Sequence, residues 1–188
     1  MNLTDLFDGF KEISEFLRFN NLNLNDRLSI KNECNNILIN SITKIECLSG
    51  YIYQDSIFPV LFYPRIVGEN NYIISFSSLD GSKNIINNGS LGSIFCIYKY
   101  DPGNNYLKEI LLSGYCLYGT KTILVTSDGK LAKQHFLNKN NEFEYINDIN
   151  IADKNNNMYS MNLSNSYDKD MTILIQHFNR NNYNLRWI

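Results

Sequence analysis

Apolar residues recur with a helical period only in the part of the chain before Gly50. Leu6, Phe10, Ile13 and Leu17 predict an amphipathic helix that begins after Thr4 as N-cap and ends near Phe19. A polar loop rich in asparagine follows. A second helix, buried on one side, is predicted by Ile30, Cys34, Ile37, Ser41 and Ile45, with Leu38 and Ile42 widening its apolar face.

After Gly50 the pattern changes to short apolar segments that are rich in β-branched and aromatic residues and are separated by Asn, Gly, Ser and Asp. A last helix is predicted from Asp168 to Asn179. Helices followed by a run of strands indicate an α+β fold with helices packed on a largely antiparallel sheet. The predicted strands are Gly50–Tyr53, Ile57–Tyr63, Tyr72–Phe76, Gly92–Tyr98, Tyr106–Tyr118, Lys121–Thr126, Lys133–Leu137 and Phe143–Ile146.

Composition removes several classes of protein. The 188 residues carry a net charge of -2 and no run of like charge, so we expect no nucleic-acid partner. No apolar stretch is long enough to cross a membrane, and the N-terminus lacks the pattern of a secretory signal. The four cysteines are widely spaced within apolar segments, which favours free thiols in a reducing cytoplasm.

Common catalytic motifs are missing from the sequence. His135 and His177 are the only histidines and do not form a zinc-binding spacing, so we interpret both as structural or solvent-exposed residues. The nucleophile-elbow, P-loop and dinucleotide-binding patterns do not occur. One segment stands apart, because the strand Tyr72–Phe76 leads into Ser-Ser-Leu-Asp-Gly-Ser. Asp80 there could offer a metal-binding oxygen beside backbone N–H groups that face a phosphate, although Asp-Gly-Ser is also a frequent plain turn.

Three blocks of the chain resemble the class 1 fructose-1,6-bisphosphatase family in the family's order. Residues 76–86 match its signature Asp-Pro-Leu-Asp-Gly-Ser-Ser-Asn-Ile-Asp at a strand end. Residues 91–98 are similar to Val-Gly-Thr-Ile-Phe-Gly-Ile-Tyr, and residues 114–125 to Gly-Tyr-x-x-Tyr-Gly-Ser-x-Thr-x-Leu-Val. The resemblance implies the N-terminal, AMP-type domain of a sugar phosphatase over residues 1–152. Residues 153–188 then start a sugar-phosphate domain that is incomplete, because family members are much longer.

The resemblance also implies a chemistry, hydrolysis of the 1-phosphate of fructose 1,6-bisphosphate with Mg²⁺ held by carboxylates. Asp80 matches a metal ligand with a catalytic role. Leu79 matches the residue whose backbone carbonyl binds metal. Gly81 and Ser82 match the residues whose N–H groups hold the phosphate.

Other positions of this pattern are altered. Ser77 stands where the family has an aspartate that bridges two metals, and Ser78 replaces the proline after it. The paired metal-binding and catalytic glutamates fall at Gln54 and Asp55, or at Ser56 and Ile57 without a gap. The aspartate of the second helix falls at Lys31 or Asn32.

Substrate and regulatory positions are only partly kept. Asn162 and Arg186 match residues near the sugar phosphate, the latter one that reaches into a neighbouring subunit of an oligomer. Tyr72 and Lys99 match a residual AMP-type site, with Asn71 in place of a lysine. Ordinary structural or surface roles are the alternative for these residues.

Two hypotheses follow from the sequence. The chain is a fructose-bisphosphatase-type enzyme represented by an incomplete and impaired polypeptide, or it is a non-catalytic binding or oligomerisation module derived from that family. Ser77 favours impairment, because a shortened chain does not explain a substituted aspartate inside the best-matched block.

Overall fold

A computed structural model of the chain describes residues 2–19, 23–54, 56, 58–62, 71–104, 106–149, 158–159 and 169–185. The contacts divide the chain into two compact units, Met1–Ile149 and Asn150–Ile188. Each unit is considered by itself below. The domain boundary expected at residue 152 stays a prediction.

The first unit is built on one eight-stranded sheet with the order β2-β1-β3-β4-β5-β6-β7-β8. Its strands are antiparallel except for β1 and β3, which pair in parallel. This architecture confirms the predicted α+β class with a largely antiparallel sheet. The strands are β1 (Leu48–Tyr53), β2 (Val60–Leu61), β3 (Asn71–Asp80), β4 (Leu91–Asp101), β5 (Tyr106–Tyr118), β6 (Thr122–Ser127), β7 (Ala132–Leu137) and β8 (Phe143–Ile149).

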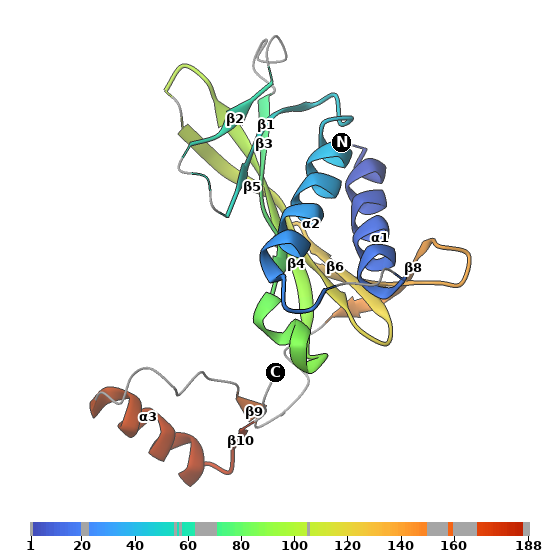
Figure 1. The fold of residues 1–188 in the computed structure, drawn as a ribbon. Coiled ribbons are helices and arrows are strands. Elements are labelled where there is room, and N and C mark those ends of the chain that lie inside the picture. Colours follow the sequence, from blue (N-terminus) through green and yellow to red (C-terminus); the bar gives the residue numbers. More distant parts are fainter. Residues whose placement is uncertain are drawn as a thin grey trace. The chain divides into compact units, whose positions relative to one another are not determined.

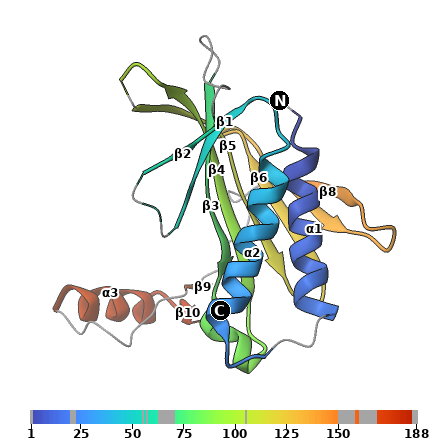
Figure 2. The same ribbon diagram turned by 45° about the horizontal axis from the view of Figure 1, so that its top comes forward.

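Two helices, α1 (Thr4–Phe19) and α2 (Arg27–Ile42), lie side by side over one face of this sheet (Figures 1 and 2). Their approach is close at Gly9, because a Cβ atom built there would lie 2.9 Å from the Cβ atom of Ser41. The apolar stripe of α1 reaches the sheet through Phe10, whose ring centroid lies 5.5 Å from that of Phe95 on β4. The core therefore sits between the helix pair and the sheet.

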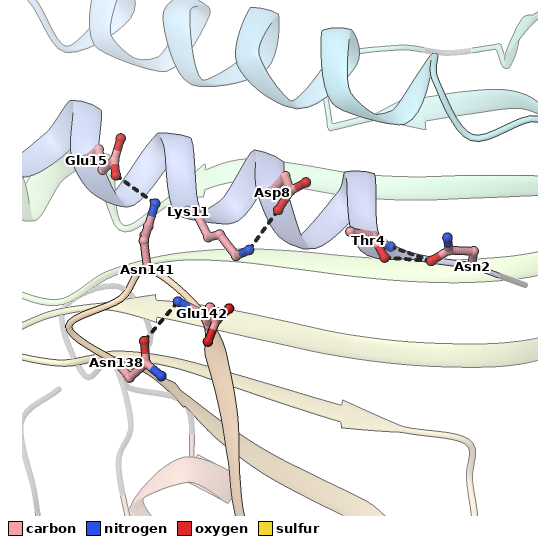
Figure 3. Close-up of polar contacts among 8 residues, drawn as sticks. All are labelled: Asn2, Thr4, Asp8, Lys11, Glu15, Asn138, Asn141 and Glu142. Atoms are coloured by element: carbon pink, nitrogen blue, oxygen red, sulfur yellow. Dashed lines mark hydrogen bonds and ion pairs between the residues drawn. The ribbon is translucent and has the colours of Figure 1, made fainter.

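The two helices of this unit begin with different polar caps, and the cap predicted for α1 is wrong. Asp26 caps α2, since its side chain accepts a hydrogen bond from the backbone N–H of Ser29 at 3.1 Å. Thr4, predicted as the N-cap of α1, lies inside the helix instead. Its own N–H donates to Oδ1 of Asn2 at 3.1 Å, so the polar cap comes from two residues earlier (Figure 3).

The turn between β7 and β8 joins the sheet to α1 (Figure 3). Asn141 takes a positive φ of 61° and donates from its side chain to Glu15 on α1 at 2.9 Å. The side chain of Asn138 holds the turn by accepting the backbone N–H of Glu142 at 3.0 Å. An edge-to-face contact between Phe7 and Phe143 adds apolar packing between α1 and β8.

Several predicted element ends differ from the structure. β3 continues through Asp80 rather than ending at Phe76, because Ser77 and Asp80 still pair with β4. The second predicted strand is reduced to β2, which begins after Pro59, a residue that cannot donate to a ladder. Ile45 is 3% exposed but lies beyond the end of α2, so burial there does not reflect helical periodicity.

The second unit contains a helix and two short strands. α3 (Lys169–Arg180) agrees closely with the predicted last helix. β9 (Met158–Tyr159) and β10 (Asn184–Leu185) pair in parallel. No helix within the described ranges is both long and apolar enough to span a membrane.

Phe10 offers a direct test of this core, because its side chain is fully buried. Truncation of a buried phenylalanine removes apolar burial and leaves a cavity, so Phe10→Ala should lower the free energy of unfolding by about 3–5 kcal/mol. Phe19 on the same helix is 81% exposed. Phe19→Ala should therefore change the stability by less than about 0.5 kcal/mol. Urea unfolding of both variants measures the difference, and equal losses would contradict this placement of the core.

His135 predicts a pH dependence of stability. Its side chain is half-buried, and Nδ1 has no hydrogen-bond partner among the described residues. Burial, aided by the charge of Lys133, lowers the pKa of His135 below 6.5 despite a hydrogen bond from the ring to the backbone of Leu124, which acts in the opposite direction.

The unfolded chain then binds this proton more readily than the folded chain. The stabilisation is complete above about pH 6.5 and is lost as the pH falls through the folded pKa. His135→Gln should flatten the fall in unfolding free energy between about pH 6.5 and 5. An unchanged slope in the variant would show that other groups cause it.

Candidate functional site

The parallel pairing of β1 with β3 brings two of the predicted site residues into contact. Gln54 follows β1, and its backbone N–H donates to the carbonyl of Phe76 at 3.1 Å. The Ser77 hydroxyl donates to Oε1 of Gln54 at 3.1 Å. The two positions that match metal-binding carboxylates of the family are thus joined by an uncharged hydrogen bond.

β3 ends in a bulge that leads into the Asp-Gly-Ser segment. Ser77 pairs with Ile94 while Asp80 pairs with Gly92, so β3 carries one extra residue at this point. Gly81 then adopts a φ of 75°, and a Cβ atom there would lie 2.6 Å from the Ser90 carbonyl oxygen. Only glycine fits this turn, which explains the residue type in physical terms. A 3₁₀ helix, η1 (Ser82–Asn87), follows.

The structure brings some predicted residues together and leaves others apart or undescribed. Gln54, Ser77 and Asp80 line one open groove of about 500 Å³, and the side chain of Asp80 is exposed. Leu79 is buried, and Gly81 and Ser82 are half-exposed at the turn beyond Asp80. The remaining lining residues are Ile52, Tyr53, Ser56, Ser75, Phe76, Ile94, Phe95, Cys96 and Tyr98. Asp55, Asn162, Arg186 and the alternative position Ile57 lie outside the described residues.

One contact at the site comes from a residue that sequence reasoning missed. The Ser78 hydroxyl donates to Oδ1 of Asn35 on α2 at 2.6 Å. Lys31 and Asn32 are the two positions on that helix that the resemblance offered. Asn35 lies four residues after Lys31 and three after Asn32, so the helical spacing placed it on the same face. That spacing was the available signal.

The described residues do not fit a centre for two or three divalent cations. Of the twelve residues that line the groove, Asp80 alone carries a carboxylate. Within the described ranges, no cluster of three or more His, Cys, Asp or Glu side chains has the proximity to hold a metal ion. Mg²⁺ and Mn²⁺ favour anionic oxygen ligands, and bringing two such cations close together requires negative charge between them. The Ser77 hydroxyl supplies none.

The residual AMP-type positions lie at the opposite end of β3. Tyr72 and Lys99 face each other directly across the β3–β4 pair. Asn71 is 1% exposed, and its Oδ1 accepts a hydrogen bond from the buried Ser49 hydroxyl at 3.0 Å. A buried residue bonded in this way has a structural role. Whether Tyr72 and Lys99 form part of a ligand site stays a prediction.

Comparison with solved structures identifies the fold. The helix-backed sheet is the fold of a fructose-1,6-bisphosphatase. The structure of the Leishmania major enzyme in its holo form matches with a TM-score of 0.81 at 22% identity, covering 98% of this chain and 63% of that chain. The apo form also gives 0.81, at 21% identity, covering 99% and 64%.

The curated sequence relatives of the chain are class 1 fructose-1,6-bisphosphatases. A class 1 fructose-1,6-bisphosphatase of Pseudoalteromonas translucida is 30% identical over 177 residues, which make up 82% of this chain and 52% of the relative. One from Neisseria meningitidis serogroup B is 29% identical over 171 residues, covering 82% and 51%. No protein-family model matches the chain. Over 82% of its length the chain is similar in sequence to class 1 fructose-1,6-bisphosphatases, and it spans about half the length of the curated relatives it matches.

The misfit of the groove to divalent cations predicts how the chain responds to metal. A cation that binds the folded state stabilises it by RT ln(1 + [L]/Kd) and so raises Tm as its concentration increases. A chain without the ligand set should show no such rise. We expect the same Tm in millimolar MgCl₂, in MnCl₂ and in EDTA. Differential scanning fluorimetry measures it, with KCl at matched ionic strength as the control. A saturable rise in Tm with Mg²⁺ that Asp80→Asn removes would contradict the prediction.

Proposed function

We propose that the chain is a sugar phosphatase of the fructose-1,6-bisphosphatase type with an impaired metal centre. It keeps the phosphate-facing turn and has little or no hydrolytic activity of its own. The observation that carries the proposal is the neutral contact between Ser77 and Gln54, 3.1 Å long, at the ends of two neighbouring strands. A bridging carboxylate at this place is what would hold two cations beside a phosphate.

The retained part supports recognition of a sugar bisphosphate. Asp80 is exposed at the groove, and Gly81 turns the chain so that Ser82 opens η1. In the proposed role, the backbone N–H groups of Gly81 and Ser82 face the phosphate, and Asp80 is the retained metal-ligand position. Asp55, Asn162 and Arg186 belong to the proposal by resemblance alone. The proposed substrate class is fructose 1,6-bisphosphate, and Mg²⁺ binding is weakened or lost.

Without a metal, the residues of the turn can still bind a phosphate group. Backbone N–H groups can bind phosphate oxygens and fix their orientation. Neither the Ser77 hydroxyl nor the Gln54 amide takes up a proton near neutral pH, so neither acts as a general base there. Binding without turnover is the expected behaviour of such a site.

The alternative is a non-catalytic oligomerisation module, and one observation favours it. Ile94 on β4 and its register partner Tyr115 on β5 are 51% and 39% exposed, and nearby Leu117 is 43% exposed. Ile94 alternates with Phe95, a core residue under the helices, so it lies on the other face of the sheet. An uncharged apolar surface of this kind is suited to contact with a second copy of the chain.

Restoring charge tests the proposed function. The double variant Ser77→Asp/Gln54→Glu returns two carboxylates to neighbouring strand ends, so it should acquire a Tm that rises with Mg²⁺ concentration. Wild type should show neither this response nor Mg²⁺-dependent phosphate release from fructose 1,6-bisphosphate. Fluorimetry and a phosphate-release assay on both proteins measure the difference.

The matched control adds Asp80→Asn to the double variant, which should remove the gained response because the retained carboxylate is lost. Phosphate release by wild type that Asp80→Asn abolishes would refute the impaired centre. Light scattering on the wild-type chain separates the alternative. A stable oligomer that dissociates in Leu117→Lys, without any phosphate binding in wild type, would favour the module over the phosphatase.

A further inference from the structure

A hydroxyl chain, formed by the buried side chains of Ser78, Ser93 and Tyr118, runs through the sheet behind the Asp-Gly-Ser turn. The Ser93 hydroxyl on β4 donates to the backbone carbonyl of Ser78 at 2.6 Å, and lies 2.6 Å from the Tyr118 hydroxyl on β5. A serine hydroxyl has one proton, which Ser93 gives to the carbonyl, so Tyr118 is the donor to Ser93. Ser93 is 0% exposed and Ser78 is 1% exposed.

The hydroxyl chain continues from β3 to α2 through one more hydrogen bond. The Ser78 hydroxyl donates to Asn35 at 2.6 Å, so four elements are joined by three short hydrogen bonds among uncharged groups. Burial raises the pKa of Tyr118 well above its usual range, with Cys116 nearby, so the phenol keeps its proton. The Tyr118 hydroxyl is therefore a hydrogen-bond donor at neutral pH.

The hydroxyl chain affects the candidate site because Ser78 lies beside it. Ser78 lies inside the bulge between Ser77 and Asp80, where the extra residue interrupts the ladder with β4. A bulge leaves backbone groups without ladder partners, and the Ser93 side chain satisfies the carbonyl of Ser78 in their place. The bulge in turn fixes the direction in which Asp80 and Gly81 leave the strand.

We propose that Tyr118 is a positioning residue for the turn Asp80–Ser82, and that it acts through Ser93 and the carbonyl of Ser78. Tyr118 lies two strands from Ser78 and does not itself line the groove that contains Asp80. Its hydroxyl orients Ser93, Ser93 holds the bulge, and the bulge holds the turn. The inference rests on the proposed function only for the identity of the ligand at that turn. The positioning itself requires no ligand.

Hydrogen exchange measured by mass spectrometry tests the role without metal or substrate. Tyr118→Phe removes one oxygen atom and leaves the Ser93 hydroxyl without its donor. Loss of one buried hydrogen-bond partner should speed local opening by about tenfold. The amides of Asn84 and Gly89 report this opening, because they donate to the carbonyls of Gly81 at 2.7 Å and Asn84 at 2.9 Å, and they should exchange about tenfold faster. Ser93→Ala removes the next link and should have the same effect on these amides.

Ser14→Ala is the matched control. Ser14 and Thr122 form another buried hydroxyl pair, 2.5 Å apart, which joins α1 to β6. Thr122 pairs with Tyr118 in the sheet, but its hydroxyl is not part of the hydrogen bonds that join Tyr118, Ser93 and Ser78. This variant should lower Tm by an amount similar to Tyr118→Phe and leave exchange at Asn84 and Gly89 unchanged. A role in general stability alone would not produce that difference.

Exchange at the turn that is unchanged in Tyr118→Phe, or raised equally by Ser14→Ala, would overturn the assignment. Failure of both Tyr118→Phe and Ser93→Ala to fold would also overturn it, because the hydroxyl chain would then determine the fold rather than position the turn. These outcomes are independent of phosphate binding and release, so the proposed function can fail while the positioning role holds.

Discussion

The pairing of β3 with a parallel neighbour on one side and an antiparallel neighbour on the other is the constraint on which the site depends. Parallel pairing with β1 makes both strands end at the same edge, so the residues after β1 meet the last residues of β3. Antiparallel pairing with β4 supplies Ser93 across from the bulge. Removing either neighbour would separate the groups that form the groove.

The position of the core explains why the residues at the ends of β1 and β3 can vary without loss of the fold. Phe10, Ile13 and Ile74 are buried together between the helices and the sheet, and none of them lines the groove. Most of the stabilising apolar burial is thus independent of what occupies positions 54 and 77. The thiols of Cys34 and Cys116 belong to this core, and burial raises the pKa of each to about 12, which keeps them protonated. Substitution at the groove therefore changes chemistry more than architecture.

Sequence patterns predicted the elements well where one face of an element is buried. α1 and α3 follow the 3.6-residue period, and β5 has the predicted bounds because its flanking turns are strongly marked. The bulge in β3 could not be predicted, since its extra residue is set by pairing with β4 rather than by local propensity. Asn35 and Tyr118 were missed for the same reason. Their roles arise from contacts between elements that lie far apart in the sequence.

The uncharged residues Ser77 and Gln54 at the ends of β3 and β1 avoid an electrostatic repulsion. Two carboxylates at neighbouring strand ends repel each other, and unit charges 4 Å apart interact by about 4 kcal/mol at an effective dielectric constant of 20. Divalent cations offset that repulsion, so a metal-binding edge is stable only when metal is present. In this chain Ser77 binds Gln54 and Ser78 binds Asn35, both without charge. The strand ends are thereby held by hydrogen bonds of the polypeptide itself.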